Sequence, residues 1–169
     1  GGALAGKTLE VLARERGTDP VTAALAVIRD GDAPAASFNM RESDIESFMR
    51  QDFVVTGSDG SGGHPRKYGT FPRKYRQYVA TRHVVSLSRF VEGSSARTAA
   101  IFGLKDRGRR REGYFADVVV LDTAGYRDRA TYENPRLPAE GVKYLLVNGV
   151  LAIENARPTG VLAGRPLHR

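Results

Sequence analysis

Apolar side chains recur at helical spacing over the first thirty residues of the chain. Three apolar positions on one face predict a first helix: Leu9, Leu12 and Ala13. Gly17 follows them and can end that helix. Asp19 is a favourable N-cap for a second helix, and Pro20 suits its first position, where no backbone N–H is needed. The second helix should bury a stripe made of Val21, Ala24, Leu25 and Ile28.

Two short apolar runs, residues 35–38 and 53–57, predict strands on either side of a third helix. That helix begins near Glu42, and we expect its inward positions to be Ile45, Phe48 and Met49. The second apolar run does not alternate, which is typical of a strand covered on both faces. Strand, helix and strand in this order predict parallel pairing with a crossover.

The middle of the chain is less regular. Residues 57–69 hold five glycines, two serines and one proline, which predicts a long loop. Long ordered loops after parallel strands tend to be functional. A helix is predicted from Pro72, with one face formed by Tyr75, Tyr78 and Val79. Two shorter helices fit residues 87–92 and 96–102.

The last third of the chain has a β pattern. Residues 116–121 are rich in valine and predict a strand. Residues 143–147 and 150–153 flank Asn148-Gly149, and this dipeptide between apolar runs is the strongest short hairpin signal. The expected fold class is therefore α/β, with a small β unit after it.

Composition narrows the protein class. The chain has 169 residues, 41% of them hydrophobic, which is enough for one domain with its own core. It has no cysteine, which excludes a disulfide scaffold and a cysteine-ligated metal site within it. No apolar run approaches the roughly 20 residues that span a bilayer, so we do not expect the chain to be an integral membrane protein. The start is no signal peptide, which favours the cytoplasm, and the missing initial Met suggests a processed product or a fragment.

The net charge of +7 is unevenly distributed. Residues 1–59 carry 6 basic and 10 acidic side chains, and residues 60–112 carry 13 basic and 3 acidic ones. Residues 113–169 are nearly balanced, with 7 basic and 6 acidic side chains. A basic middle segment is compatible with nucleic acid, with a small anionic ligand, or with an ordinary solvated surface.

Asp59 is the main candidate for catalysis. It directly follows the predicted buried strand, and active sites of parallel α/β proteins are built at the carboxyl ends of strands. A carboxylate there can take a proton from a metal-bound water and return it to a leaving group. The alternative is that Asp59 only caps a turn, as Asp before Gly often does.

Four neighbours of Asp59 are candidates for substrate binding: Ser58, His64, Arg66 and Tyr68. Arg66 suits an α-carboxylate because a guanidinium matches a carboxylate bidentately. His64 either orients substrate or hydrogen-bonds within the loop, and it has no second ligand at zinc-binding spacing. Lys67 and Arg73 in the same stretch are expected in solvent.

Several motifs, taken in order, resemble one known family. Residues 57–73, GSDGSGGHPRKYGTFPR, resemble the last barrel strand and following loop of the N-acyl-D-amino-acid deacylases, or D-aminoacylases, of the amidohydrolase superfamily. Further segments continue the resemblance: ASFNM at 36–40, GLKDRG at 103–108, GYFADVVVLD at 113–122, DRATYENP at 128–135 and VNG at 147–149. The ordered set is specific, although the last motif alone is generic.

The resemblance implies a (β/α) TIM-like barrel of the metal-dependent hydrolases with a small β-sandwich beside it. It implies hydrolysis of an N-acyl-D-amino acid to a carboxylate and a free D-amino acid. In that family zinc polarises the amide carbonyl and activates a water. Asp59 matches the catalytic aspartate, which is the base toward that water and the acid toward the amine.

The family's zinc ligands, among them a His-x-His motif and a cysteine, have no counterpart in this sequence. The chain resembles the C-terminal third of a full deacylase. We assign residues 1–112 to the last strands and helices of the barrel and residues 113–169 to the C-terminal part of the sandwich. We expect the chain alone to bind no zinc and to be inactive, while its open sheet edges would allow copies to associate.

A different hypothesis makes the chain a non-catalytic interaction or nucleic-acid-binding module that uses the basic segment 60–112. Its densest cluster consists of Arg107, Arg109, Arg110 and Arg111. No familiar nucleic-acid-binding motif accompanies this cluster, and the aromatic residues do not follow base-stacking spacing. Nucleic acid is therefore not the expected partner, and the role of the four arginines stays open.

Overall fold

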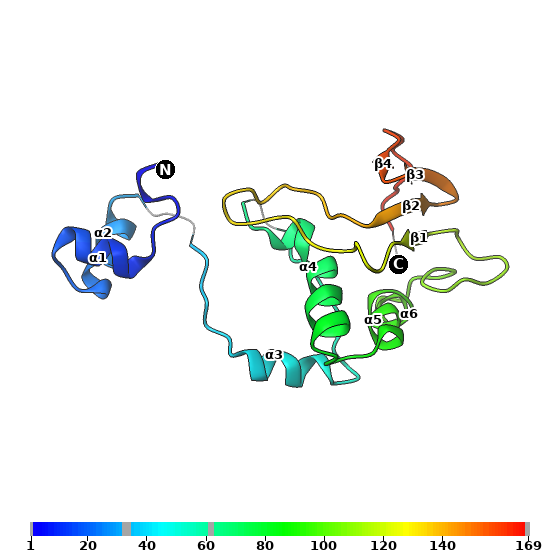
Figure 1. Ribbon diagram of the computed structural model, residues 1–169, viewed down its shortest axis with the longest axis horizontal. Coiled ribbons are helices and arrows are strands. Elements are labelled where there is room, and N and C mark those ends of the chain that lie inside the picture. The colour runs from blue at the N-terminus through cyan, green and yellow to red at the C-terminus, as the bar shows by residue number, and fades with distance from the viewer. Residues whose placement is uncertain (1, 32–34, 61–62, 168–169) are drawn as a thin grey trace. The chain divides into compact units, whose positions relative to one another are not determined.

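The computed structural model describes residues 2–31, 35–60 and 63–167 (Figure 1). These residues form two compact units, Gly1–Asn39 and Met40–Arg169. The division falls inside the segment that the sequence assigns to the barrel, and the predicted boundary after residue 112 stays a prediction. No helix in the described part of the chain is long and apolar enough to cross a membrane.

The first unit contains a short 3-10 turn, η1 (Gly2–Leu4), and two helices, α1 (Leu9–Arg16) and α2 (Pro20–Arg29). Gly17 ends α1 with a φ of 64°, as a left-handed glycine cap should. Asp19 caps α2 by accepting hydrogen bonds from the backbone N–H groups of Val21 and Thr22 at 2.9 and 3.0 Å. Both helix boundaries confirm the prediction from capping residues.

The buried stripe predicted for α2 is wrong. Val21, Leu25 and Ile28 are more than 60% exposed, and the side chain of this helix that is fully buried is Ala23. The unit is small, and among its described residues α2 packs mainly on α1, which leaves much of the α2 surface exposed. The spacing of apolar residues therefore predicts which face of a helix is apolar, but not whether another element covers that face.

The two predicted strands at residues 35–38 and 53–57 are also wrong. Both segments lack regular secondary structure, and the helix between them, α3 (Glu42–Met49), is present as predicted. Phe48 on that helix is 55% exposed, whereas Ile45 and Met49 are half-buried. A strand exists only where a neighbour accepts and donates its backbone hydrogen bonds, and no described residue pairs with either segment in a ladder.

The next helix begins earlier than predicted. Helix α4 (Arg66–Lys74) contains Pro72 in its interior and continues into a π-helical stretch, η2 (Tyr75–Thr81). Proline favours the first helical turn, so the sequence placed the start at Pro72, six residues too late. The predicted inward face is confirmed, since Tyr75, Tyr78 and Val79 are buried.

Two short helices and a four-stranded sheet complete the second unit. The helices are α5 (Leu87–Ser94) and α6 (Ala96–Ile101), close to their predicted ranges. The strands are β1 (Val118–Leu121), β2 (Val142–Val147), β3 (Val150–Glu154) and β4 (Arg157–Pro158). They pair antiparallel in sequence order, and the sheet lies at the upper right of Figure 1. The fold class α/β is confirmed, but all strand pairing in the described residues is antiparallel.

The predicted hairpin is present between β2 and β3. Asn148 and Gly149 have φ values of 51° and 81°, which is the left-handed geometry of a type I′ turn. Val147 and Val150 pair directly across this turn. The Asn-Gly signal therefore gives both the position and the register of the hairpin.

An aromatic cluster joins the helices to the sheet. The buried members are Tyr75, Val79, Val85, Phe90 and Tyr126. The Tyr75 ring centroid lies 5.5 Å from that of Tyr126 and 5.8 Å from that of Phe90. Such tilted ring pairs stabilise by about 0.5–1.5 kcal/mol beyond their burial. The cluster fixes η2, which continues the helix next to the candidate site.

Candidate functional site

Asp59 lies on the irregular segment between α3 and α4, with its side chain 82% exposed. Its φ is 42°, a left-handed backbone conformation that is uncommon for a residue other than glycine. Asp is among the residues that tolerate this conformation best. The turn thus presents the carboxylate at the surface of this chain.

Arg66, the first residue of α4, contacts both the side chain and the backbone of Asp59. Its Nη2 lies 2.8 Å from the carboxylate Oδ2, and its Nε–H donates to the backbone carbonyl of Asp59 at 2.7 Å. The Arg66 side chain is 39% exposed. A rigid guanidinium that binds side chain and backbone together restricts both the position of the loop and the orientation of the carboxylate.

His64 is fixed by two neighbours. Its Nδ1 accepts a hydrogen bond from the backbone N–H of Arg66 at 3.1 Å, so in the neutral ring the proton resides on Nε2. Nε2 lies 3.3 Å from the hydroxyl of Tyr132, and the two rings meet edge to face at 5.2 Å. Burial and the nearby Arg66 cation lower the pKa of His64, against a smaller opposite effect of Asp59.

Tyr132 is a site residue that the sequence did not single out. It belongs to the motif at 128–135, on the long yellow stretch between β1 and β2 in Figure 1, and lies 68 positions from His64. The same stretch reaches α4 at Gly69, where an added Cβ would lie 3.4 Å from Cβ of Asp128. The motif itself is the signal that could have indicated this contact.

The other candidate residues lie on the same stretch of chain but differ in solvent exposure. Ser58 is half-buried beside Asp59, and Tyr68 is 38% exposed on the first turn of α4. Lys67 and Arg73 are exposed on the same helix, as expected. The aliphatic part of Lys67 lies against Gly60, where an added Cβ would be 3.5 Å from Lys67 Cγ.

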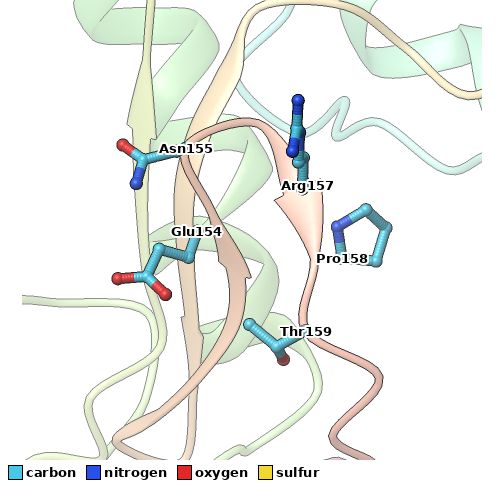
Figure 2. A pocket seen from close by; sticks show the side chains of 5 residues that line it. All are labelled: Glu154, Asn155, Arg157, Pro158 and Thr159. Carbon is cyan, nitrogen blue, oxygen red and sulfur yellow. The ribbon is translucent and has the colours of Figure 1, made fainter.

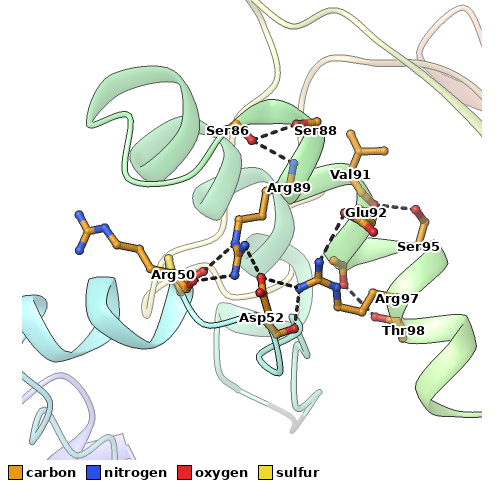
Figure 3. Close-up of polar contacts among 12 residues, drawn as sticks. Arg50, Asp52, Ser86, Ser88, Arg89, Val91, Glu92, Ser95, Arg97 and Thr98 are labelled. Carbon is orange, nitrogen blue, oxygen red and sulfur yellow. Dashed lines mark hydrogen bonds and ion pairs between the residues drawn. The ribbon is translucent and has the colours of Figure 1, made fainter.

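Two arginines hold Asp52, at the start of the irregular segment that leads to Asp59 (Figure 3). Arg89 of α5 donates to Asp52 Oδ1 and to the carbonyl of Arg50, both at 2.7 Å. Arg97 of α6 donates to the Asp52 carbonyl at 2.5 Å and pairs with Glu92. These contacts lower the pKa of Asp52, with the hydrogen bond from Arg89 as the first cause. They also tie the end of α3 to the following helices.

The residues do not fit a metal site. Among the described residues no group of three His, Asp or Glu side chains lies close enough to hold a metal ion. His64 contacts Tyr132 and the backbone of Arg66 rather than a second potential ligand.

Two surface hollows lie away from Asp59. One lies at the β3–β4 turn, where Figure 2 shows its lining side chains, Glu154, Asn155, Arg157, Pro158 and Thr159. The other lies between α5 and the segment Gly108–Arg111 and includes Leu87 and Val91. None of the catalytic or substrate-binding candidates lines either hollow, whereas Arg109, Arg110 and Arg111 line the second.

Sequence comparison places these features in a family. Residues 1–153 match the model of the amidohydrolase family. The chain is 36% identical to an N-acyl-D-glutamate deacylase and 37% identical to a D-aminoacylase, both from Alcaligenes xylosoxydans xylosoxydans. These alignments cover 91% and 98% of this chain but 32% and 34% of the relatives. The chain thus spans about a third of the length of these relatives, in their C-terminal portion.

Solved structures agree. A D-aminoacylase with a binuclear metal centre matches with a TM-score of 0.88 and 37% identity, covering 99% of this chain and 35% of that protein. An N-acyl-D-glutamate deacylase from Bordetella bronchiseptica, solved with zinc and a phosphonate inhibitor, matches with a TM-score of 0.78 and 33% identity over 90% of this chain and 33% of its own. The chain belongs to the amidohydrolase family.

Proposed function

We propose that the chain is the C-terminal part of a zinc-dependent enzyme that hydrolyses N-acyl-D-amino acids to a carboxylate and a free D-amino acid. Similarity to deacylases of this class over nearly the whole chain supports the substrate class. The observation that carries the chemistry is the exposed carboxylate of Asp59, held in a left-handed turn by Arg66.

Asp59 acts as the base and then as the acid. Its carboxylate accepts a proton from the water that attacks the amide carbon, and the same proton then passes to the amine as the C–N bond breaks. Arg66 binds Oδ2. We assign the other carboxylate oxygen, Oδ1, to proton transfer.

Arg66 connects the base with the anionic end of the substrate in this proposal. Arg66 contacts Asp59 through Nε and Nη2, and a guanidinium matches a carboxylate in geometry. We assign Arg66 to the α-carboxylate of the D-amino acid. Ser58, His64 and Tyr68 are assigned to the walls of the substrate site.

We also assign the chain to a larger barrel-and-sandwich fold. Residues 1–112 would supply the last part of a (β/α) barrel, and residues 113–169 would supply strands of a β-sandwich. Since the described residues form no metal site, we propose that the zinc ligands come from outside this chain. We also propose that the unpaired segment 53–57 gains its strand neighbours in the complete barrel.

Asp59→Asn in the full-length enzyme tests this role. The amide cannot accept the proton of the attacking water, so kcat should fall by about 10²–10⁴-fold. The metal content, measured by elemental analysis, should equal that of the parent enzyme.

Asp44→Asn is the matched control, because Asp44 is an exposed carboxylate on α3. Its kcat should stay within about twofold of the parent. Near-normal turnover of Asp59→Asn would remove Asp59 from the acid–base role.

A further inference from the structure

Basic side chains from the following helices hold the segment that leads to Asp59. Residues 53–58 join no ladder in the described residues, so these side chains are the contacts that this chain itself supplies. Arg89 and Arg97 hold the start of the segment at Asp52, and Arg66 holds its end at Asp59.

Lys74 contacts the segment at Thr56, between these two ends. Its Nζ donates to the Thr56 hydroxyl at 2.6 Å, from the last residue of α4. Lys74 is half-buried, and this burial, helped by the positive charge of Arg89, lowers its pKa. An ammonium group withdrawn from water loses hydration, and the Thr56 hydroxyl restores part of that loss.

The spacing of the contacts aligns the segment with the helix. Arg66 and Lys74 are the first and last residues of α4, separated by about 12 Å along its axis. Thr56 and Asp59 are three residues apart and span at most about 11 Å. Because these lengths are similar, the two ends of α4 can hold the two ends of segment 56–59, which runs antiparallel to the helix.

We propose that Lys74 is a positioning residue for Asp59 and acts through the Thr56 hydroxyl. This inference rests on the proposed function of Asp59. Without the contact, Thr56 loses its hydrogen bond to α4, and the orientation of the carboxylate three residues later is less restricted. Since the acid–base step depends on the orientation of the carboxylate, kcat should fall more than KM rises.

The first measurement is independent of activity. Hydrogen exchange of the full-length enzyme, followed by mass spectrometry, reports the mobility of residues 53–59. Lys74→Met and Thr56→Val should each speed exchange of that peptide at least about threefold. Arg73→Met is the matched control, because Arg73 is the adjacent exposed cation of the same helix, and its exchange should equal that of the parent.

Kinetics supply the second measurement. Lys74→Met should lower kcat about 10- to 100-fold and change KM less than about twofold. Lys74→Arg keeps a long cationic donor and should recover most of kcat. The double variant Lys74→Met/Thr56→Val should be no slower than either single variant, since both remove the same contact.

Each outcome has one meaning. Unchanged exchange of residues 53–59 in Lys74→Met and Thr56→Val, or multiplied kcat losses in the double variant, would overturn the role of Lys74. A parent enzyme that hydrolyses no N-acyl-D-amino acid would instead overturn the proposed function, and the exchange data would still decide whether Lys74 holds the segment.

Discussion

His64 joins the loop of Asp59 to the C-terminal part of the second unit through Tyr132. Its Nδ1 can accept from the Arg66 N–H only while the ring is neutral. Protonation therefore breaks this bond and places a second cation beside Arg66. Both effects agree with the lowered pKa of His64, whose first cause is burial.

The direction of this shift fixes its pH dependence. Because the folded state holds the pKa of His64 below its unfolded value of about 6.5, the unfolded chain binds more protons in that interval. The contribution of neutral His64 to stability is thus present above pH 6.5 and is lost as the pH falls through the folded pKa. NMR titration of the full-length enzyme should give His64 a pKa below 6.5.

His64→Gln supplies the control for this prediction. Glutamine keeps a hydrogen-bonding side chain but does not titrate, so the difference in unfolding free energy between parent and variant should shrink from pH 7 to pH 5. A difference that grows toward acidic pH would contradict the assigned hydrogen bond.

Sequence reasoning found the residues of the site that lie close together along the chain. Asp59, His64 and Arg66 lie within one stretch of eight residues, so a single motif indicates all three. Tyr132 and Lys74 were missed for different reasons. Tyr132 reaches His64 from a distant segment, and Lys74 resembles any helical lysine until its contact with Thr56 is known.

At the scale of elements, local signals predicted helix ends and the hairpin, but not the strands of the first sixty residues. Gly17, Asp19 and Asn148 act on backbone groups within a few residues, and their effects are visible in the structure. Segments 35–38 and 53–57 depend on distant partners, which apolar composition cannot supply.

Three of the family-like motifs meet in one hydrogen-bonded cluster. Arg107 binds the Asp117 carboxylate, donates to Asn148 Oδ1 at 2.5 Å and lies over the Phe115 ring at 4.1 Å. Asp117 in turn accepts from the backbone N–H of Asn148 at 2.8 Å. The cluster therefore ties the segment before β1 to the β2–β3 turn, which explains Arg107 without any ligand.

Arg107→Met should lower the free energy of unfolding of the full-length enzyme by roughly 2–4 kcal/mol. The arginine side chain is 13% exposed, and its loss leaves Asp117 and Asn148 without their shared donor. Urea denaturation measures the change. Arg109→Met, an exposed neighbour, should change stability by less than about 0.5 kcal/mol, and equal losses would contradict the cluster's role.

Across the whole molecule, part of the uneven charge is explained by ion pairs between two segments of the chain. Basic side chains of segment 60–112 bind acidic residues of segment 42–59 in a series of ion pairs: Arg66–Asp59, Arg82–Glu42, Arg82–Glu46, Arg89–Asp52 and Arg97–Asp52. Exposed pairs of this kind stabilise weakly one by one, but as a set they fix the Asp59 segment. This pairing leaves less positive charge for a nucleic acid, and Arg109 to Arg111 stay exposed beside α5.

Hydrolysis of N-acyl-D-amino acids is the decisive assay for the proposed function. The full-length enzyme, the isolated 169-residue chain and matched D and L substrates would be compared by chiral chromatography of the released amino acid. We expect free D-amino acid from the full-length enzyme, little product from L substrates and none from the isolated chain. No product from the full-length enzyme with any N-acyl-D-amino acid, or equal turnover by the isolated chain, would contradict the proposal.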